Sequence, residues 1–152
     1  MRDDLSRINK LLPEFNVIYF DEIDSTNNYA KTLITSNANN SKLHGTLIAT
    51  NHQTSGRGRL GHSFDSPAGT GLYMSIILRP GNNNFQFITI ADAVSVCLAI
   101  EDLCPELKDS LGIKWVNDIY LDNKKITGIL TEAITSLESG EIDSIVTGIG
   151  IN

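Results

Sequence analysis

Residues 112–130, GIKWVNDIYLDNKKITGIL, decide the fold class, because three short apolar stretches follow one another here with little between them. Gly112–Val116, Ile119–Leu121 and Lys125–Leu130 each have the composition of a strand. Asp122-Asn123, between the last two, is typical of a two-residue hairpin turn. We therefore expect antiparallel neighbours in this part of the chain.

Four further strands are expected where β-branched and aromatic residues cluster, at Phe15–Phe20, Gly45–Thr50, Leu72–Leu78 and Ile142–Ile151. Helical spacing predicts two helices. One is Asn27–Ile34, after the N-cap residues Asp24-Ser25-Thr26, and the other is Phe85–Leu103, which is apolar on most sides and expected to be buried. The sequence thus predicts an α+β fold, a mainly antiparallel mixed sheet with helices packed on one face.

Composition indicates one globular domain of 152 residues, with 41% hydrophobic and 20% charged residues. No apolar run approaches the roughly 20 residues of a membrane helix. The first ten residues are polar, and they are not followed by the apolar stretch that a signal peptide has. We therefore expect a cytoplasmic protein that does not bind membranes. The net charge of −6 argues against a nucleic-acid-binding protein.

The cysteines and histidines give no sign of a disulfide or a structural metal. Cys97 and Cys104 lie on the expected second helix, where seven residues separate their Cα atoms by roughly 10 Å, too far for a disulfide. We expect both to be reduced and buried. The three histidines, His44, His52 and His62, have no zinc-type spacing.

The long glycine-rich loop Gln53–Gly71 contains the stretch Gly56-Arg-Gly-Arg-Leu-Gly61. It is not a dinucleotide-binding turn, because no helical pattern follows it, and it lacks the Gly-Lys-Ser/Thr ending of a phosphate loop. Two arginines separated by glycine could grip a carboxylate or phosphate. A basic surface loop is the alternative from these residues alone.

Polar residues gather again at Lys114-Trp-Val-Asn-Asp118, and the hairpin would bring Lys125 close to them. Two ammonium groups, an amide and a carboxylate could hold a polyphosphate and its magnesium; surface salt bridges are the alternative. Strand alternation predicts Lys125 and Thr127 on one face and Ile126 and Gly128 on the other.

The final stretch, Gly148-Ile-Gly-Ile-Asn152, places small residues on a strand, where another group could approach the backbone closely. Asn152 could then present its amide to a base edge. A bulge or a simple packing role for the glycines is the alternative.

Together these stretches resemble the biotin protein ligases of the biotin/lipoate ligase superfamily, over about Phe20 to Asn152. The resemblance is carried by five motifs in order: Asp24-Ser-Thr-Asn27, Gln53-Thr-Ser-Gly-Arg-Gly-Arg-Leu-Gly61, Lys114-Trp-Val-Asn-Asp118, Lys125-Ile-Thr-Gly-Ile-Leu130 and Gly148-Ile-Gly-Ile-Asn152. It implies a class II synthetase-like sheet. This chain departs from the family at Val116, where proline is usual, and at Phe64, where tryptophan is usual.

The resemblance implies roles for individual residues. Biotin would be bound by Ser25, Thr26, Asn27, Gln53, Arg57, Gly58, Arg59 and Lys125. The nucleotide would be bound by Arg57, Arg59, Phe64, Lys114, Asn117, Lys125 and Asn152. The catalytic charges would come from Arg57, Arg59, Lys114 and Lys125, with Asp118 supporting Mg²⁺.

The resemblance also implies an activity. Biotin and ATP would give biotinyl-AMP, and the biotinyl group would pass to a lysine of a biotin carboxyl carrier protein. We expect residues 1–152 to be a catalytic domain that lacks the family's C-terminal part and has no N-terminal DNA-binding domain, and hence no DNA partner; a homodimer is a possible assembly. A lipoate or octanoate ligase of the same superfamily and a non-catalytic biotin-binding module are the alternatives.

Overall fold

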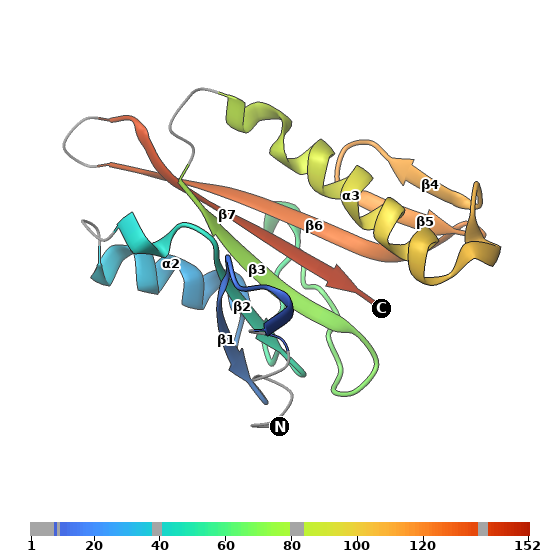
Figure 1. The fold of residues 1–152 in the computed structure, drawn as a ribbon, viewed down its shortest axis with the longest axis horizontal. Helices are drawn as coiled ribbons and strands as arrows, with labels where there is room; N and C mark the ends of the chain where they lie inside the picture. Colours follow the sequence, from blue (N-terminus) through green and yellow to red (C-terminus); the bar gives the residue numbers. More distant parts are fainter. Residues whose placement is uncertain (1–7, 9, 38–40, 80–83, 137–139) are drawn as a thin grey trace.

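The computed structural model describes residues 8, 10–37, 41–79, 84–136 and 140–152, and within these ranges the strands form one seven-stranded sheet. Its order is β1-β2-β3-β7-β6-β5-β4 (Figure 1). The strands are β1 (Asn16–Phe20), β2 (Thr46–Thr50), β3 (Leu72–Leu78), β4 (Leu111–Lys114), β5 (Asp118–Leu121), β6 (Lys124–Thr135) and β7 (Ile142–Ile151). Only β1 and β2 pair in parallel, so the predicted mainly antiparallel mixed sheet and the α+β class are confirmed.

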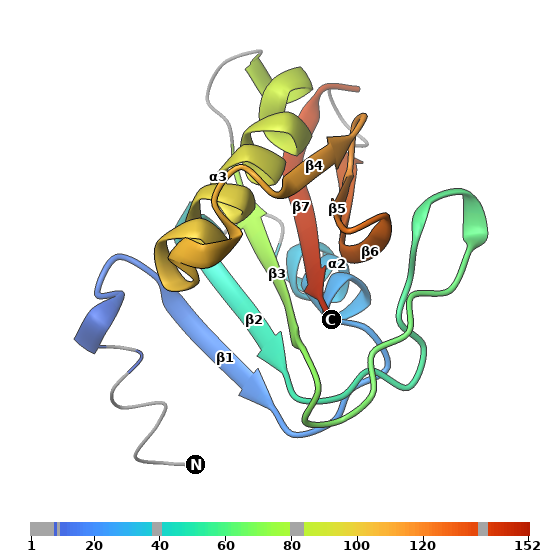
Figure 2. The same ribbon diagram turned by 90° about the vertical axis from the view of Figure 1, so that its right-hand side faces the viewer.

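The two helices, α2 (Thr26–Ser36) and α3 (Ile88–Leu103), lie on opposite faces of the sheet (Figures 1 and 2). Ala30 and Ile34 of α2 pack with Val146 of β7, whereas Ala93 of α3 packs with Ile149 of the same strand. Residues an odd number apart on a strand point to opposite faces. The expected placement of helices on one face is therefore wrong, and the long apolar run of β7 is explained by burial on both faces.

Helix α3 is buried along one side only. Ala93 and Val96 are its buried residues, while Val94 and Leu98 on the outer side are 43% and 56% exposed. The expectation of a buried helix is thus wrong, because the sheet contacts only one side of the helical cylinder. Cys97 on this helix and Cys104 at its end are free thiols, and both are half-buried rather than buried. Among the described residues, no helix has the length and apolar character to span a bilayer.

The predicted hairpin turn is present, with positive φ angles of 49° at Asp122 and 63° at Asn123. Both central residues of a type I′ turn have this left-handed conformation, which Asp and Asn tolerate better than most residues. The register between β5 and β6 shifts directly afterwards, since Tyr120 pairs with Lys125 but Ile119 pairs with Thr127. A β-bulge therefore lies at Ile126.

The bulge overturns the expected alternation along β6. Thr127 lies opposite Ile119, which is part of the core beneath α3, whereas Lys125 lies on the other face with Gly128. One extra residue in the strand is enough to reverse the side to which Lys125 points. Strand β6 also continues to Thr135, well beyond the predicted end at Leu130. The strand is therefore five residues longer at this end than predicted.

A half-buried acid on the inner side of α3 gives a test of the packing. Thr147 Oγ1 donates a 2.6 Å hydrogen bond to Asp92 Oδ2, but burial dominates and raises the pKa of Asp92 above its ordinary value of 3.8. Ionising this carboxyl therefore costs stability, and the cost grows as the pH rises from the unfolded-state pKa through the folded-state pKa.

We predict that Asp92→Asn, which keeps an acceptor for Thr147, is more stable than wild type at pH 7. The difference should shrink as the pH is lowered through the raised pKa of Asp92, because the wild-type carboxyl then becomes neutral. Denaturant unfolding at several pH values measures this, with Asp102→Asn at an exposed position of the same helix as the control. Equal changes for the two variants, or a loss of stability in Asp92→Asn at pH 7, would contradict the assignment.

Candidate functional site

A pocket opens on the α2 face of the sheet, over β6 and β7, and encloses about 430 Å³ with its open mouth included. Its walls come from the start of α2, from the loop between β2 and β3, and from the sheet. The lining residues are Ser25, Thr26, Asn27, Gln53, Arg57, Gly58, Arg59, Phe64, Met74, Asn117, Lys125, Gly128, Ile129, Leu130, Gly148, Ile149 and Gly150. Each of the five predicted motifs contributes residues to this lining, so the structure brings all five to one place.

Glycines form the floor of this pocket. Gly128 pairs with Gly150 across β6 and β7, and Leu130 pairs with Gly148. A Cβ at Gly128 would lie 2.8 Å from the Phe64 ring, and one at Gly150 would overlap the same ring. A Cβ at Gly148 would overlap the amide of Asn27. The predicted close approach to this strand is therefore confirmed, and the groups that approach are Phe64 and Asn27.

The start of α2 forms the polar end of the pocket. Ser25 caps the helix, since its Oγ accepts from the backbone N–H of Asn28 at 3.5 Å. Gln53 Oε1 accepts from the backbone N–H and the hydroxyl of Thr26, at 3.0 and 3.2 Å. Gln53 Nε2 donates to Ser66 Oγ at 3.0 Å, which fixes the orientation of the Gln53 amide. The predicted grouping of Ser25, Thr26 and Gln53 is thus observed.

Asn27 is held mainly by the protein itself. Its Nδ2 donates to the backbone carbonyl of Leu130 at 3.2 Å and to Glu132 Oε2 at 2.9 Å, which uses both amide hydrogens. Its Oδ1 accepts from Ser75 Oγ, a fully buried hydroxyl on β3. A direct contact between Asn27 and biotin remains a prediction, whereas its link between α2 and the sheet is present in the structure.

The loop between β2 and β3 folds back on itself and crosses the pocket, rising beside the sheet in Figure 2. Gly58 N–H donates to the carbonyl of His62 at 2.7 Å, and Phe64 N–H donates to that of Gly56 at 2.9 Å. The two arginines then reach in different directions. Arg57 Nη1 donates to Asn28 Oδ1 at 2.9 Å, and Arg59 Nη1 donates to Asn117 Oδ1 at 2.7 Å.

Cations and one carboxylate meet where β5 and β6 begin. Lys125 Nζ lies 2.9 Å from Asp118 Oδ1, and Asn117 Nδ2 donates to the same oxygen at 2.7 Å. The ammonium of Lys125 also lies 6.0 Å from the centroid of the Phe64 ring. Lys125, Asn117 and Asp118 are therefore clustered, as the hairpin predicted.

Three predicted residues lie outside the pocket lining: Asp118, which pairs with Lys125 at its edge, Lys114 and Asn152. Lys114 is exposed, and its ammonium lies 5.5 Å from the centroid of the Tyr120 ring. Asn152 Oδ1 accepts from Tyr73 OH at 3.0 Å, and its Nδ2 donates to the carbonyl of Asp65 at 3.1 Å. Asn152 thus ties the end of β7 to the crossing loop, while adenine recognition by this residue remains a prediction.

A magnesium ion would find a single acid here, Asp118. Within the described residues, no group of three or more His, Cys, Asp or Glu side chains is placed to hold a metal ion. Mg²⁺ commonly uses one or two carboxylates and takes its other ligands from substrate phosphates and water. Asp118 fits that pattern only as the protein's contribution to a phosphate-bound ion.

Residues 19–152 match the model of the biotin/lipoate A/B protein ligase family. The chain belongs to this family. A bifunctional ligase/repressor BirA from Bacillus subtilis is 40% identical over 139 residues, covering 90% of this chain and 40% of that protein. The chain therefore spans well under two thirds of the length of this relative.

Solved structures of family members have the same fold. The biotin protein ligase from Aquifex aeolicus in complex with biotin and ATP is 35% identical with a TM-score of 0.71, and the match covers 90% of this chain and 52% of that one. The Leishmania major biotin protein ligase, in complex with biotinyl-5-AMP, has a TM-score of 0.72 at 23% identity, which shows the shared fold. That match covers 90% of this chain and 57% of that one.

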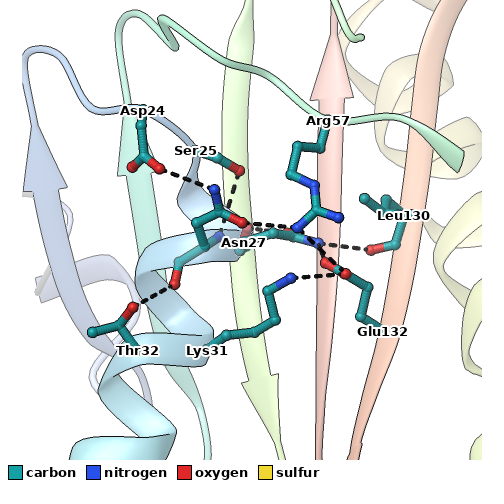
Figure 3. A network of polar contacts seen from close by, with 10 residues as sticks. Asp24, Ser25, Asn27, Lys31, Thr32, Arg57, Leu130 and Glu132 are labelled. Carbon is teal, nitrogen blue, oxygen red and sulfur yellow. Dashed lines mark hydrogen bonds and ion pairs between the residues drawn. The ribbon is translucent and has the colours of Figure 1, made fainter. Parts of the chain in front are cut away.

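A charged residue beside this pocket, Glu132, lies outside the five sequence motifs. Glu132 of β6 lies between Lys31 of α2, at 2.8 Å, and Arg57 of the loop, at 3.7 Å (Figure 3). A signal for it exists in the sequence. Glu132 follows Gly128 and Leu130 at the two-residue spacing of one strand face, and it is the only acid among them.

We predict that Gly150→Ala displaces Phe64 and loosens the crossing loop, because the added Cβ would occupy the position of the ring. Overpacking of this kind costs about 1–3 kcal/mol when neighbours cannot move. Trypsin should therefore cut faster after Arg57 and Arg59 in the unliganded variant. Gly112→Ala is the matched control, since a Cβ there meets nothing within 4 Å. Equal cleavage rates in the two variants would show that Phe64 does not hold the loop.

Proposed function

We propose that this chain carries the catalytic site of a biotin protein ligase. The enzyme would activate biotin with ATP to biotinyl-5′-AMP and pass the biotinyl group to a lysine of a biotin carboxyl carrier protein. The observation that carries the proposal is a single pocket with neutral hydrogen-bonding groups at one end and three cations, Arg57, Arg59 and Lys125, around the rest. Family membership supports it, as does the complex of the Aquifex aeolicus relative with biotin and ATP.

The neutral end suits biotin's ureido ring, which offers two N–H donors and a carbonyl acceptor. Ser25, Thr26 and Gln53 supply hydroxyl and amide groups there. Hydrogen bonds of Gln53 to Thr26 and Ser66, and of Ser25 to the backbone of Asn28, fix their positions. Because Ser25 and Thr26 are almost fully buried, a ligand group in this region would meet donors and acceptors that are already oriented.

The cationic part suits the first chemical step. A carboxylate oxygen of biotin would attack the α-phosphorus of ATP, forming the acyl-phosphate bond as the bond to pyrophosphate breaks. Two anions must come together for this, so charge neutralisation and alignment are the main tasks of the protein. Lys125 stands at the pocket wall, and Arg57 and Arg59 reach it from the loop.

In the second step, a carrier lysine amine would attack the acyl carbon, form the amide and release AMP. The crossing loop would meanwhile shelter the adenylate from water. A bound Mg²⁺, with Asp118 as its protein ligand, would neutralise phosphate charge in the first step. We also propose Phe64, Lys114, Asn117 and Asn152 as nucleotide-binding residues. A cytoplasmic location and a homodimer remain predictions.

Biotin-dependent exchange of labelled pyrophosphate into ATP tests the proposal in the full-length protein. We expect exchange with biotin and not with lipoate or octanoate. Exchange with lipoate or octanoate alone would identify a ligase for another acid. Biotin binding without any exchange would identify a non-catalytic binding protein.

Two neighbouring lysines give a sharper test of the site. We predict that Lys125→Ala reduces pyrophosphate exchange at least about 100-fold, the scale of losing one electrostatic stabiliser of a transition state. Lys124→Ala should stay near wild type, because Lys124 is exposed beside the hairpin turn and does not line the pocket. Comparable rates in the two variants would remove Lys125 from the catalytic residues.

A further inference from the structure

We propose that Glu132 is a positioning residue that holds Arg57 of the crossing loop, and Asn27 of α2, in place at the pocket. The proposal rests on the ligase function proposed above and extends it to a residue outside the five motifs. Glu132 lies where three separate segments meet: strand β6, helix α2 and the loop (Figure 3).

The strand register places Glu132 on the pocket side of the sheet. Glu132 pairs with Val146, which belongs to the α2 core, just as Leu130 pairs with Gly148 on the pocket floor. Its carboxylate therefore projects beside α2 rather than beneath α3. Its side chain is 22% exposed, so its ion pairs are partly withdrawn from water and stronger than ordinary surface pairs.

Helix α2 supplies two donors to this carboxylate. Lys31 Nζ lies 2.8 Å from Oε1, and Asn27 Nδ2 lies 2.9 Å from Oε2. The two residues are four apart, so they occupy the same side of the helix. Burial opposes ionisation of Glu132, but the hydrogen bonds from Lys31 and Asn27 and the charges of Lys31 and Arg57 outweigh it and lower the pKa of Glu132. The group is a carboxylate at neutral pH.

One guanidinium nitrogen of Arg57 contacts two different residues. Its Nη1 lies 3.7 Å from Glu132 Oε1 and 2.9 Å from Asn28 Oδ1. Asp24 Oδ2 accepts from Asn28 Nδ2 at 2.9 Å, which turns the Oδ1 of Asn28 towards Arg57. In the described part of the chain these contacts use Nη1, and the remaining guanidinium donors stay available to a bound anion.

The ion-paired side chains still favour an anion. One carboxylate, Glu132, stands against two cations, Lys31 and Arg57, so these three carry a net single positive charge, while Asp24 contacts the neutral amide of Asn28. Glu132 thus fixes the arginine without cancelling its attraction for the carboxylate and phosphate of an acyl-adenylate.

The first test replaces Glu132 with glutamine, which keeps an acceptor for Asn27 but removes the charge that attracts Lys31 and Arg57. In the unliganded full-length protein, we expect E132Q to be cut by trypsin after Arg57 and Arg59 about 10-fold faster than wild type. Glu106→Gln, which removes the same charge at an exposed position after α3, should not change the rate. An unchanged rate in E132Q would overturn the proposal.

The second test is a double-mutant cycle on the affinity for a non-hydrolysable biotinyl-adenylate analogue. We expect E132Q to weaken binding about 10-fold when Arg57 is present, and less than about twofold in the Arg57→Ala background, because a residue acting through Arg57 has little effect without it. Equal losses in both backgrounds would indicate a purely structural role and overturn the proposal. If E132Q does not fold, E132D, which keeps the charge but shortens its reach, takes its place in the same cycle.

The two tests separate this proposal from the proposed function. If the wild-type protein binds neither biotin nor the analogue, the ligase function fails, and the cleavage rates alone then decide whether Glu132 holds the loop. If the wild type binds the analogue and E132Q changes neither cleavage nor affinity, the ligase function stands and the role of Glu132 fails.

Discussion

The backbone pairing of Gly128 with Gly150 across β6 and β7 is the constraint on which the site depends. In most sheets, side chains from paired strands fill the space above the backbone. Glycines leave this space open here. The Phe64 ring therefore lies directly over Gly128 and Gly150, and the Asn27 amide lies over Gly148. The loop and the helix that form the upper walls of the pocket are positioned by these two contacts.

The electrostatics of the site differ from those of the chain as a whole. The net charge is −6, yet three cations line one pocket, and their partners include neutral amides as well as carboxylates. Arg59 donates to the Asn117 amide, and Arg57 donates to that of Asn28. Neutral partners orient a guanidinium without neutralising it, so the local potential stays favourable to anions inside an acidic protein.

Much of the sheet and the pocket could be predicted from the sequence because the signals are local. The Asp122-Asn123 turn identified the hairpin, and the resemblance to the family grouped Ser25, Thr26, Gln53, Lys125 and the arginines in one site. The bulge at Ile126 could not be predicted, since it depends on how β5 and β6 pair, and it reverses the side of Lys125. The placement of the helices on opposite faces of the sheet and the exposure of one side of α3 were also not predicted, because both depend on tertiary packing. Glu132 was missed because its partners are distant in sequence, at Lys31 and Arg57.

The crossing loop leaves and re-enters the sheet at adjacent positions, since Thr50 at the end of β2 pairs with Tyr73 near the start of β3. Directly paired residues lie roughly 5 Å apart, so the span that the loop must bridge is set by the sheet and not by the loop's own length. Insertions and deletions in this segment therefore leave the strand connectivity intact. The sequence of the loop can therefore change during evolution while the strands keep their pairing. Such changes would alter the ligand preference of the pocket without altering the fold.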